Sequence, residues 1–284
     1  MNGGGSMGEL KFDCEDLKYL FMQIGLANPS GNSYKERLHK HGQLEDYYIM
    51  VKSVLNKVST KKPVVLLDCG CGRSYLSFYL NYQFQQEGRT NLHFVGIDTN
   101  EDLIEKCAGA ARELEFTNME FHSGSIIECK IDKKPDVVYS LHACDFATDQ
   151  MIARGVLDGA RYILSVSCCQ HTARSQISKH PLTSITRFKP YKERIVDMVS
   201  DSMRGLLLES LGYNVDIFEF VPTKSTPKNI MLRAAKGSKS QINMEKAAIE
   251  YIKLSKMFNI HPGVETYLKD ILQESSSYYK EVLG

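Results

Sequence analysis

Short apolar runs alternate with longer amphipathic stretches through the middle of the chain. The first run, at 64–67, contains only Val and Leu, is too short for a buried helix and is typical of a buried parallel strand. Similar strand patterns follow at 92–98, 119–122, 136–141 and 162–166, with helical patterns between them at 74–86, 101–114 and 148–157. Strands that alternate with helices of this length predict right-handed βαβ units and a parallel sheet.

The pattern changes toward both ends of the chain. A long helix predicted at 191–211 precedes strand candidates at 215–220 and 229–235, whose short connection favours an antiparallel pair. Helical spacing continues at 240–260. We therefore expect three parts: a helical extension at 1–60, whose residues 1–6 are a cloning remnant, a core at 61–236 and a helical extension at 237–284.

The composition is that of an ordinary soluble protein, with 43% apolar and 24% charged residues and a net charge of +1. No apolar stretch is long enough to span a bilayer, and the N-terminal residues lack the apolar segment of a signal peptide. Eight cysteines without a disulfide-type framework indicate reduced thiols. We expect a cytoplasmic protein without a membrane or secreted partner, and the oligomeric state stays open.

The clearest chemical signal is a glycine turn between the first strand and the first helix of the core. It reads Asp68-Cys69-Gly70-Cys71-Gly72, and glycines there let the backbone turn tightly and approach a ligand. A dinucleotide site would need a third small residue, where Tyr75 stands, so the turn argues against a pyrophosphate. A carboxylate at Asp98, followed by Thr99, ends the next strand and suits a ribose.

These motifs resemble those of class I, Rossmann-like S-adenosylmethionine methyltransferases. The resemblance implies an α/β fold with a seven-stranded, mostly parallel sheet that has one antiparallel strand. It implies S-adenosylmethionine as cofactor, S-adenosylhomocysteine as product, and no metal. The implied cofactor-binding residues are Asp68, Gly70 and Gly72 for the amino-acid end, Asp98 and Thr99 for the ribose, Gly124, Ser125 and Ile126 for the adenine, and Leu141.

The residues that follow two later strands resemble those of a smaller group of these methyltransferases. Residues 141–149 read LHACDFATD and residues 165–171 read SVSCCQH. This pair is similar to a group within the methyltransferase-domain family that distantly resembles the tRNA acceptor-stem 2′-O-methyltransferase, over about residues 35–236. The resemblance implies methyl transfer to RNA, either tRNA or rRNA. A protein or small-molecule substrate, and a SAM- or RNA-binding module without catalysis, are the alternatives.

Catalytic candidates gather at the same strand ends. They are His142, Asp145, His171, Lys228 and Asn229, and either histidine would act as a general base because imidazole titrates near neutral pH. Three interpretations of the group Cys144, Cys168, Cys169 and His171 stay open: catalysis, a zinc site, or small side chains that fill tight space.

Basic residues are concentrated in two stretches, one after the predicted strand at 162–166 and one after the predicted strand at 215–220. The stretch 171–194 contains six cations and one acid, and 222–239 contains five cations and no acid. This distribution favours a phosphate backbone, with Phe188 and Tyr191 available to stack on bases, although lysine-rich loops are often merely solvated. Lys40 and Gln43, on the predicted helix before the core, are candidates for the cofactor or substrate, but a surface position is the preferred interpretation.

Overall fold

A computed structural model describes residues 15–27, 35–143, 145–177, 180–221 and 229–283, without the side chains of 15–17, 35–41 and 281–283. Cys144 and Lys228 therefore lie outside the described residues.

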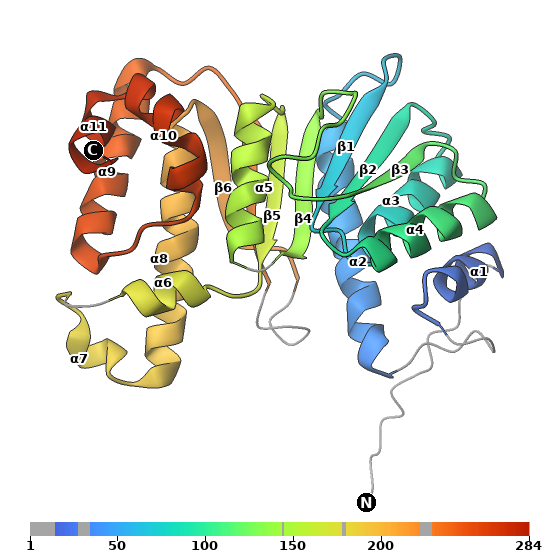
Figure 1. The fold of residues 1–284 in the computed structure, drawn as a ribbon, viewed down its shortest axis with the longest axis horizontal. Coiled ribbons are helices and arrows are strands. Elements are labelled where there is room, and N and C mark those ends of the chain that lie inside the picture. Colours follow the sequence, from blue (N-terminus) through green and yellow to red (C-terminus); the bar gives the residue numbers. More distant parts are fainter. Residues whose placement is uncertain (1–14, 28–34, 144, 178–179, 222–228, 284) are drawn as a thin grey trace, which may run out of the picture.

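One seven-stranded sheet forms the centre of the molecule (Figure 1). The strand order is β3-β2-β1-β4-β5-β7-β6. The strands are β1 (Val64–Cys69), β2 (Leu92–Asp98), β3 (Met119–Ser123), β4 (Val137–Ala143), β5 (Tyr162–Ser167), β6 (Tyr213–Glu219) and β7 (Ile230–Lys236).

The polarity of the strands confirms the expected fold class. The first five strands pair in parallel, and β7 lies between β5 and β6, antiparallel to both. This arrangement explains the continuous apolar run at 64–67, because parallel strands at the centre of a sheet are covered on both faces. In β1, Val64 and Leu66 belong to one core, whereas Val65 and Leu67 belong to the other.

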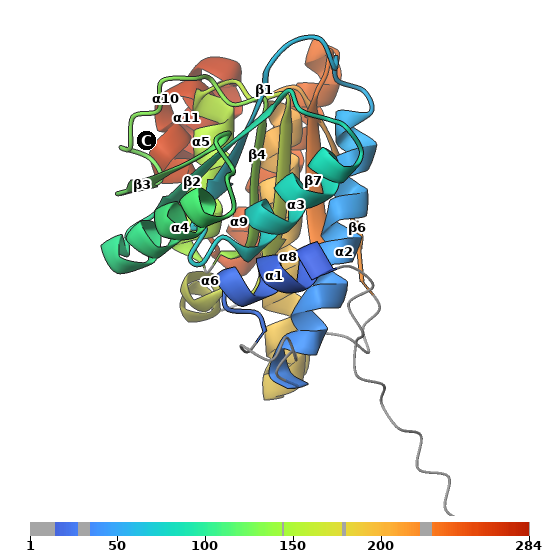
Figure 2. The same cartoon turned by 90° about the vertical axis from the view of Figure 1, so that its right-hand side faces the viewer.

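Helices cover both faces of the sheet (Figures 1 and 2). One core includes side chains of α1 (Glu15–Gln23), α2 (Lys35–Leu55), α3 (Tyr75–Gln86) and α4 (Glu101–Glu113). The other includes side chains of α5 (Phe146–Leu157), α6 (His171–Gln176), α8 (Lys189–Ser210), α9 (Gln241–Phe258), α10 (Val264–Ser275) and α11 (Ser277–Leu283). The short α7 (Thr183–Thr186) lies against α8.

The observed elements agree with the predicted ones except near their ends. The Asn100 side chain accepts a hydrogen bond from the backbone N–H of Leu103 and caps α4 at its N-terminus. The fourth strand continues to Ala143, two residues beyond the predicted end, and its pairing with β5 has a bulge between Leu141 and Ala143. The sequence patterns did not resolve α6, α7, α10 and α11, which are short or interrupted by polar residues.

Candidate functional site

The glycine turn is held against the end of the neighbouring strand. The backbone N–H groups of Gly70 and Cys71 both donate to the carbonyl oxygen of Ile97, at 2.8 and 3.0 Å. Gly70 has φ +68° and Gly72 has φ +54°, a conformation in which a side chain is disfavoured. The turn therefore brings its own backbone close to the end of β2.

Asp98 connects β2 to this turn through its side chain. Carboxylate atom Oδ2 accepts from the N–H of Gly72 at 2.8 Å, and Oδ1 accepts from the N–H of Asn100 at 2.9 Å. Thr99, between them in the chain, is exposed. The structure thus brings Asp98 and Gly72 together, while the Thr99 side chain faces solvent.

Asp68 is buried beneath the same turn. Its carboxylate accepts hydrogen bonds from the hydroxyls of Ser77 and Ser74, the latter at 3.4 Å. Burial raises the pKa of Asp68 to about 7, and the nearby Asp98 charge acts in the same direction, against the lowering effect of the two serines. Ser77 was not predicted as a site residue, because a serine on a helix gives no sequence signal by itself.

A cavity of about 170 Å³ lies beside Asp68. It is lined by residues from four segments: Gln43 and Leu44 of α2, Asp68, Gly70 and Cys71 of the turn, Tyr75 and Leu76 of α3, and Leu141 and His142 of β4. The predicted residues Asp68, Gly70, Leu141 and His142 therefore share one concave site.

The structure places Gln43 in the interior, whereas a surface position was preferred from the sequence. Its side chain is only 7% exposed, and its Oε1 lies 3.1 Å from Nε2 of His142. The preferred surface position was wrong because α2 has no strongly apolar face, so its sequence did not indicate which side is buried. The Lys40 side chain lies outside the described residues.

The end of β3 adopts a glycine-dependent turn. Gly124 has φ +155°, and its N–H donates to the Asp98 carbonyl oxygen at 2.9 Å. Ser125 is half-buried, and Ile126 is buried in the core. The Ile126 carbonyl oxygen accepts from Nη1 of Arg154 at 2.8 Å. The three residues thus follow the strand end beside Asp98, with Ile126 directed into packing, and their adenine contact stays a prediction.

The remaining catalytic candidates have different surroundings. The carboxylate of Asp145 accepts from the N–H and hydroxyl of Thr172, at 2.8 and 2.7 Å, and so ties the end of β4 to α6. His171 is exposed at the first position of α6. Asn229 is buried, and its Nδ2 donates to the Val221 carbonyl oxygen at 2.9 Å. The roles of these side chains in transfer stay predictions.

The cysteine pair after β5 lies next to His142. The sulfur atoms of Cys168 and Cys169 are 3.8 Å apart, and Cys168 Sγ donates to the His142 carbonyl oxygen at 3.5 Å. Within the described part of the chain, which excludes Cys144, no group of three or more His, Cys, Asp or Glu side chains is arranged to hold a metal ion.

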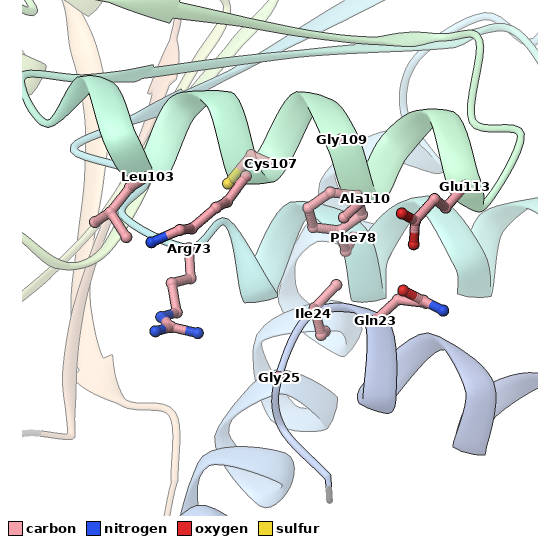
Figure 3. A pocket seen from close by; sticks show the side chains of 11 residues that line it. Gln23, Ile24, Gly25, Arg73, Phe78, Leu103, Cys107, Gly109, Ala110 and Glu113 are labelled. Carbon is pink, nitrogen blue, oxygen red and sulfur yellow. The ribbon is translucent and has the colours of Figure 1, made fainter. Parts of the chain in front are cut away.

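A larger cavity, of about 380 Å³, lies behind the glycine turn between α1, α3 and α4 (Figure 3). Phe78 and Ile24 form part of its apolar wall, and Arg73 lies near one end. Cys107 lines this cavity, and its thiol donates to the Gly72 carbonyl oxygen at 3.5 Å. Cys107 therefore lies between the cavity and the turn. This cavity contains none of the predicted cofactor residues.

Comparison with known proteins finds one family model that matches the part of the chain containing this site. Residues 39–176 match the model of a family described as a methyltransferase domain. No curated protein sequence matches the chain. Among solved structures, magnesium protoporphyrin IX methyltransferase from Synechocystis PCC 6803 with bound SAM is 13% identical, with 78% of this chain and 90% of that chain covered and a TM-score of 0.46. A SAM-dependent methyltransferase from Aquifex aeolicus is 17% identical, with 79% and 97% covered and a TM-score of 0.41.

Proposed function

We propose that RNA is the substrate of this chain, an enzyme that carries a methyltransferase domain at residues 39–176 and uses S-adenosylmethionine. When bound, this cofactor supplies an electrophilic methyl group on a sulfonium. The protein then has to align the acceptor with that methyl, and positioning of this kind is worth up to about 7–11 kcal/mol.

The residues at the strand ends fit the cofactor in chemistry and shape. Asp68, a buried carboxylate beside a cavity, suits the cofactor's ammonium group. Gly70 and Gly72 have positive φ values, which disfavour other residues, and their lack of side chains lets a ligand approach the backbone there. Asp98 lies at the neighbouring strand end, where we assign it to the ribose hydroxyls.

The observation that carries the RNA proposal is an exposed aromatic and cationic surface at α7 and the beginning of α8, here called the α7–α8 surface. It comprises the exposed residues Arg187, Phe188, Lys189, Tyr191 and Arg194, and the half-buried Lys192. Phe188 and Tyr191 are 50% and 51% exposed, and the Arg187 guanidinium lies 4.8 Å from the Phe188 ring centroid. Exposed rings beside cations suit bases and phosphates of a single strand.

The position of this surface supports the same partner. Helix α6 begins four residues after β5 ends, and Figure 1 shows α6, α7 and the start of α8 beyond the carboxyl ends of β4 and β5. The second basic stretch contributes less, because Arg233 pairs with Asp216 and Lys239 pairs with Glu209. Lys224 and Lys228 lie outside the described residues.

A transfer assay tests the function directly. Purified protein would be incubated with methyl-tritiated S-adenosylmethionine and fractionated cell extract, and label would be counted in RNA, protein and small molecules. We expect label in RNA. Label confined to protein or small molecules would replace the substrate proposal, and confirmed cofactor binding without label in any fraction would favour a non-catalytic module.

Variants of the α7–α8 surface test how RNA is bound. We expect the double variant Arg187→Ala, Lys192→Ala to bind a fluorescent single-stranded RNA more weakly and with a smaller salt dependence, because two phosphate contacts are lost. The matched control, Lys246→Ala with Lys253→Ala, removes two exposed cations from α9. Equal RNA affinity in both double variants would contradict the assignment of this surface.

A further inference from the structure

His142 occupies an unusual backbone position at the edge of the 170 Å³ cavity. It lies within the bulge of β4, where Leu141 pairs with Val166 and Ala143 with Ser167. Its φ of +62° is in the left-handed region, which is uncommon for residues other than glycine. Bulges redirect side chains, and strained backbone of this kind concentrates at functional sites.

The imidazole also contacts a side chain of α2 that lines the same cavity. Gln43 reaches it from α2, and the 3.1 Å separation of Gln43 Oε1 and His142 Nε2 is a hydrogen-bond distance. With the Gln43 amide oxygen facing His142, as it does in this structure, the oxygen can only accept, and this orientation assigns the ring proton to Nε2. In the neutral ring the proton-accepting nitrogen is then Nδ1.

Because the Gln43 side chain is buried, loss of its hydrogen bond to His142 would be costly. Gln43 is almost fully buried, and a buried amide oxygen that loses its partner carries an energetic penalty. The helix that carries Gln43 is itself fixed to the sheet: Tyr47, one turn along α2, donates its hydroxyl toward the carbonyl oxygens of Ser140, at 3.2 Å, and Leu164, at 3.0 Å. Gln43 thus has a rigid support close to the end of β4.

We propose that Gln43 is a positioning residue that sets the tautomer and orientation of His142 for proton removal from the methyl acceptor. This inference rests on the proposed methyl transfer and limits the acceptor to an O–H or N–H group. The acceptor's lone pair forms the bond to the methyl carbon, and the electron pair of the broken carbon–sulfur bond remains on sulfur. The acceptor's proton moves to Nδ1 of His142.

Other titratable groups face the same cavity and have to be held constant in any test. They are Asp68 of β1, Cys71 of the glycine turn and Tyr75 of α3, with Cys168 contacting the His142 backbone from the end of β5. Asp68 titrates near neutral pH, in the same range as an imidazole. A comparison of variants at Gln43 leaves all four groups in place.

The decisive substitution is Gln43→Glu, which places a carboxylate beside His142 Nε2. We expect the imidazole pKa of His142 to rise, as measured by NMR on histidine-labelled protein without cofactor. The acidic limb of the kcat/KM profile, measured with total RNA, should shift to higher pH by the same amount. The exposed Gln86→Glu on α3 is the matched control and should leave both quantities unchanged.

Two further variants keep the inference testable if Gln43→Glu folds poorly. Gln43→Leu should lower kcat about tenfold or more without raising the His142 pKa, while affinity for S-adenosylmethionine in calorimetry stays within about threefold. His142→Asn, which tolerates a left-handed backbone, should lower kcat by about 10²–10⁴ and assigns the NMR signal.

The outcomes separate this inference from the proposed function. An unchanged His142 pKa in Gln43→Glu, or full activity in His142→Asn, would overturn the inference while methyl transfer itself persisted. Absence of transfer by the parent protein would overturn the proposed function, and the NMR titration would still report whether Gln43 controls the His142 ring.

Discussion

Two carboxylates near the glycine turn have different environments and are expected to act differently. Asp68 is buried and its pKa is raised to about 7, mainly by burial. In the folded protein it keeps a proton that the unfolded chain releases at lower pH. Its contribution to the free energy of unfolding is therefore present below about pH 4 and is lost as pH rises through about 7.

Affinity for S-adenosylmethionine should rise with pH in the same range. An ionised Asp68 attracts the cofactor's ammonium group, so the association constant should increase by up to about tenfold per pH unit between pH 5.5 and 7. Calorimetric titration at several pH values measures this. In Asp68→Asn the dependence should disappear, and a parent protein with pH-independent affinity would show that Asp68 does not contact the cofactor.

Asp98 should contribute through hydrogen bonds instead. In Asp98→Ala the ribose loses its proposed acceptor and the N–H of Gly72 loses its partner, so we expect cofactor affinity to fall by about 10–100-fold. Asp132→Ala, in the exposed loop that leads to β4, is the control and should bind like the parent. Unchanged affinity in Asp98→Ala would remove Asp98 from the cofactor site.

At the scale of elements, the sequence patterns predicted strands and helices well because burial on both faces leaves continuous apolar runs. Motif residues such as Asp68 and Gly70 were found because glycine turns have few sequence solutions. Gln43 was a candidate from the sequence, but its burial and its contact with His142 were not predicted, and neither was the bulge at His142. These features depend on how α2 packs against β4, which no local pattern encodes.

A buried network around Arg204 joins four segments of the chain, on the face of the sheet that α5 and α8 cover. Nε of Arg204, in α8, donates to Asp149 of α5 at 2.8 Å, and Nη1 donates to Gln170, after β5, at 2.8 Å. The second oxygen of Asp149 accepts from the N–H of Gly263, which precedes α10, at 2.8 Å. This network links the C-terminal helices to the segment that contains the cysteine pair.

Removal of the Arg204 charge should lower the free energy of unfolding substantially. In Arg204→Met, the buried Asp149 and the half-buried Asp201 lose their cation, and we expect a loss of about 3–5 kcal/mol in the free energy of unfolding. Arg233→Met breaks an exposed ion pair with Asp216 and should cost about 1 kcal/mol or less. Chemical denaturation compares the two, and equal losses would contradict a special role for the buried network.

At the scale of the whole molecule, the C-terminal helices share one core with the sheet. Tyr251, Leu268 and Leu272 are fully buried in the same cluster as Ile163 and Ala234 of the sheet. None of the described helices is long and apolar enough to cross a membrane. The boundary proposed at residue 237 stays a prediction, but it does not separate two hydrophobic cores.

Stability should therefore depend on the C-terminal helices. We expect Leu268→Ala to lower the free energy of unfolding by about 2–5 kcal/mol, because it leaves a cavity in the shared core. Ile242→Ala, at a side chain that is 78% exposed, should change it by about 0.5 kcal/mol or less. A folded, stable chain that ends at residue 239 would show that these helices are dispensable.

The position of β7 also constrains the order in which the sheet is completed during synthesis. Strand β6 leaves the ribosome before β7, yet among the described strands it pairs only with β7, which also fills the open edge of β5. Until residue 236 has emerged, a nascent chain therefore carries both an open β5 edge and an unpaired β6. Unpaired edges attract other strands, so this interval is when the growing chain is most exposed to aggregation.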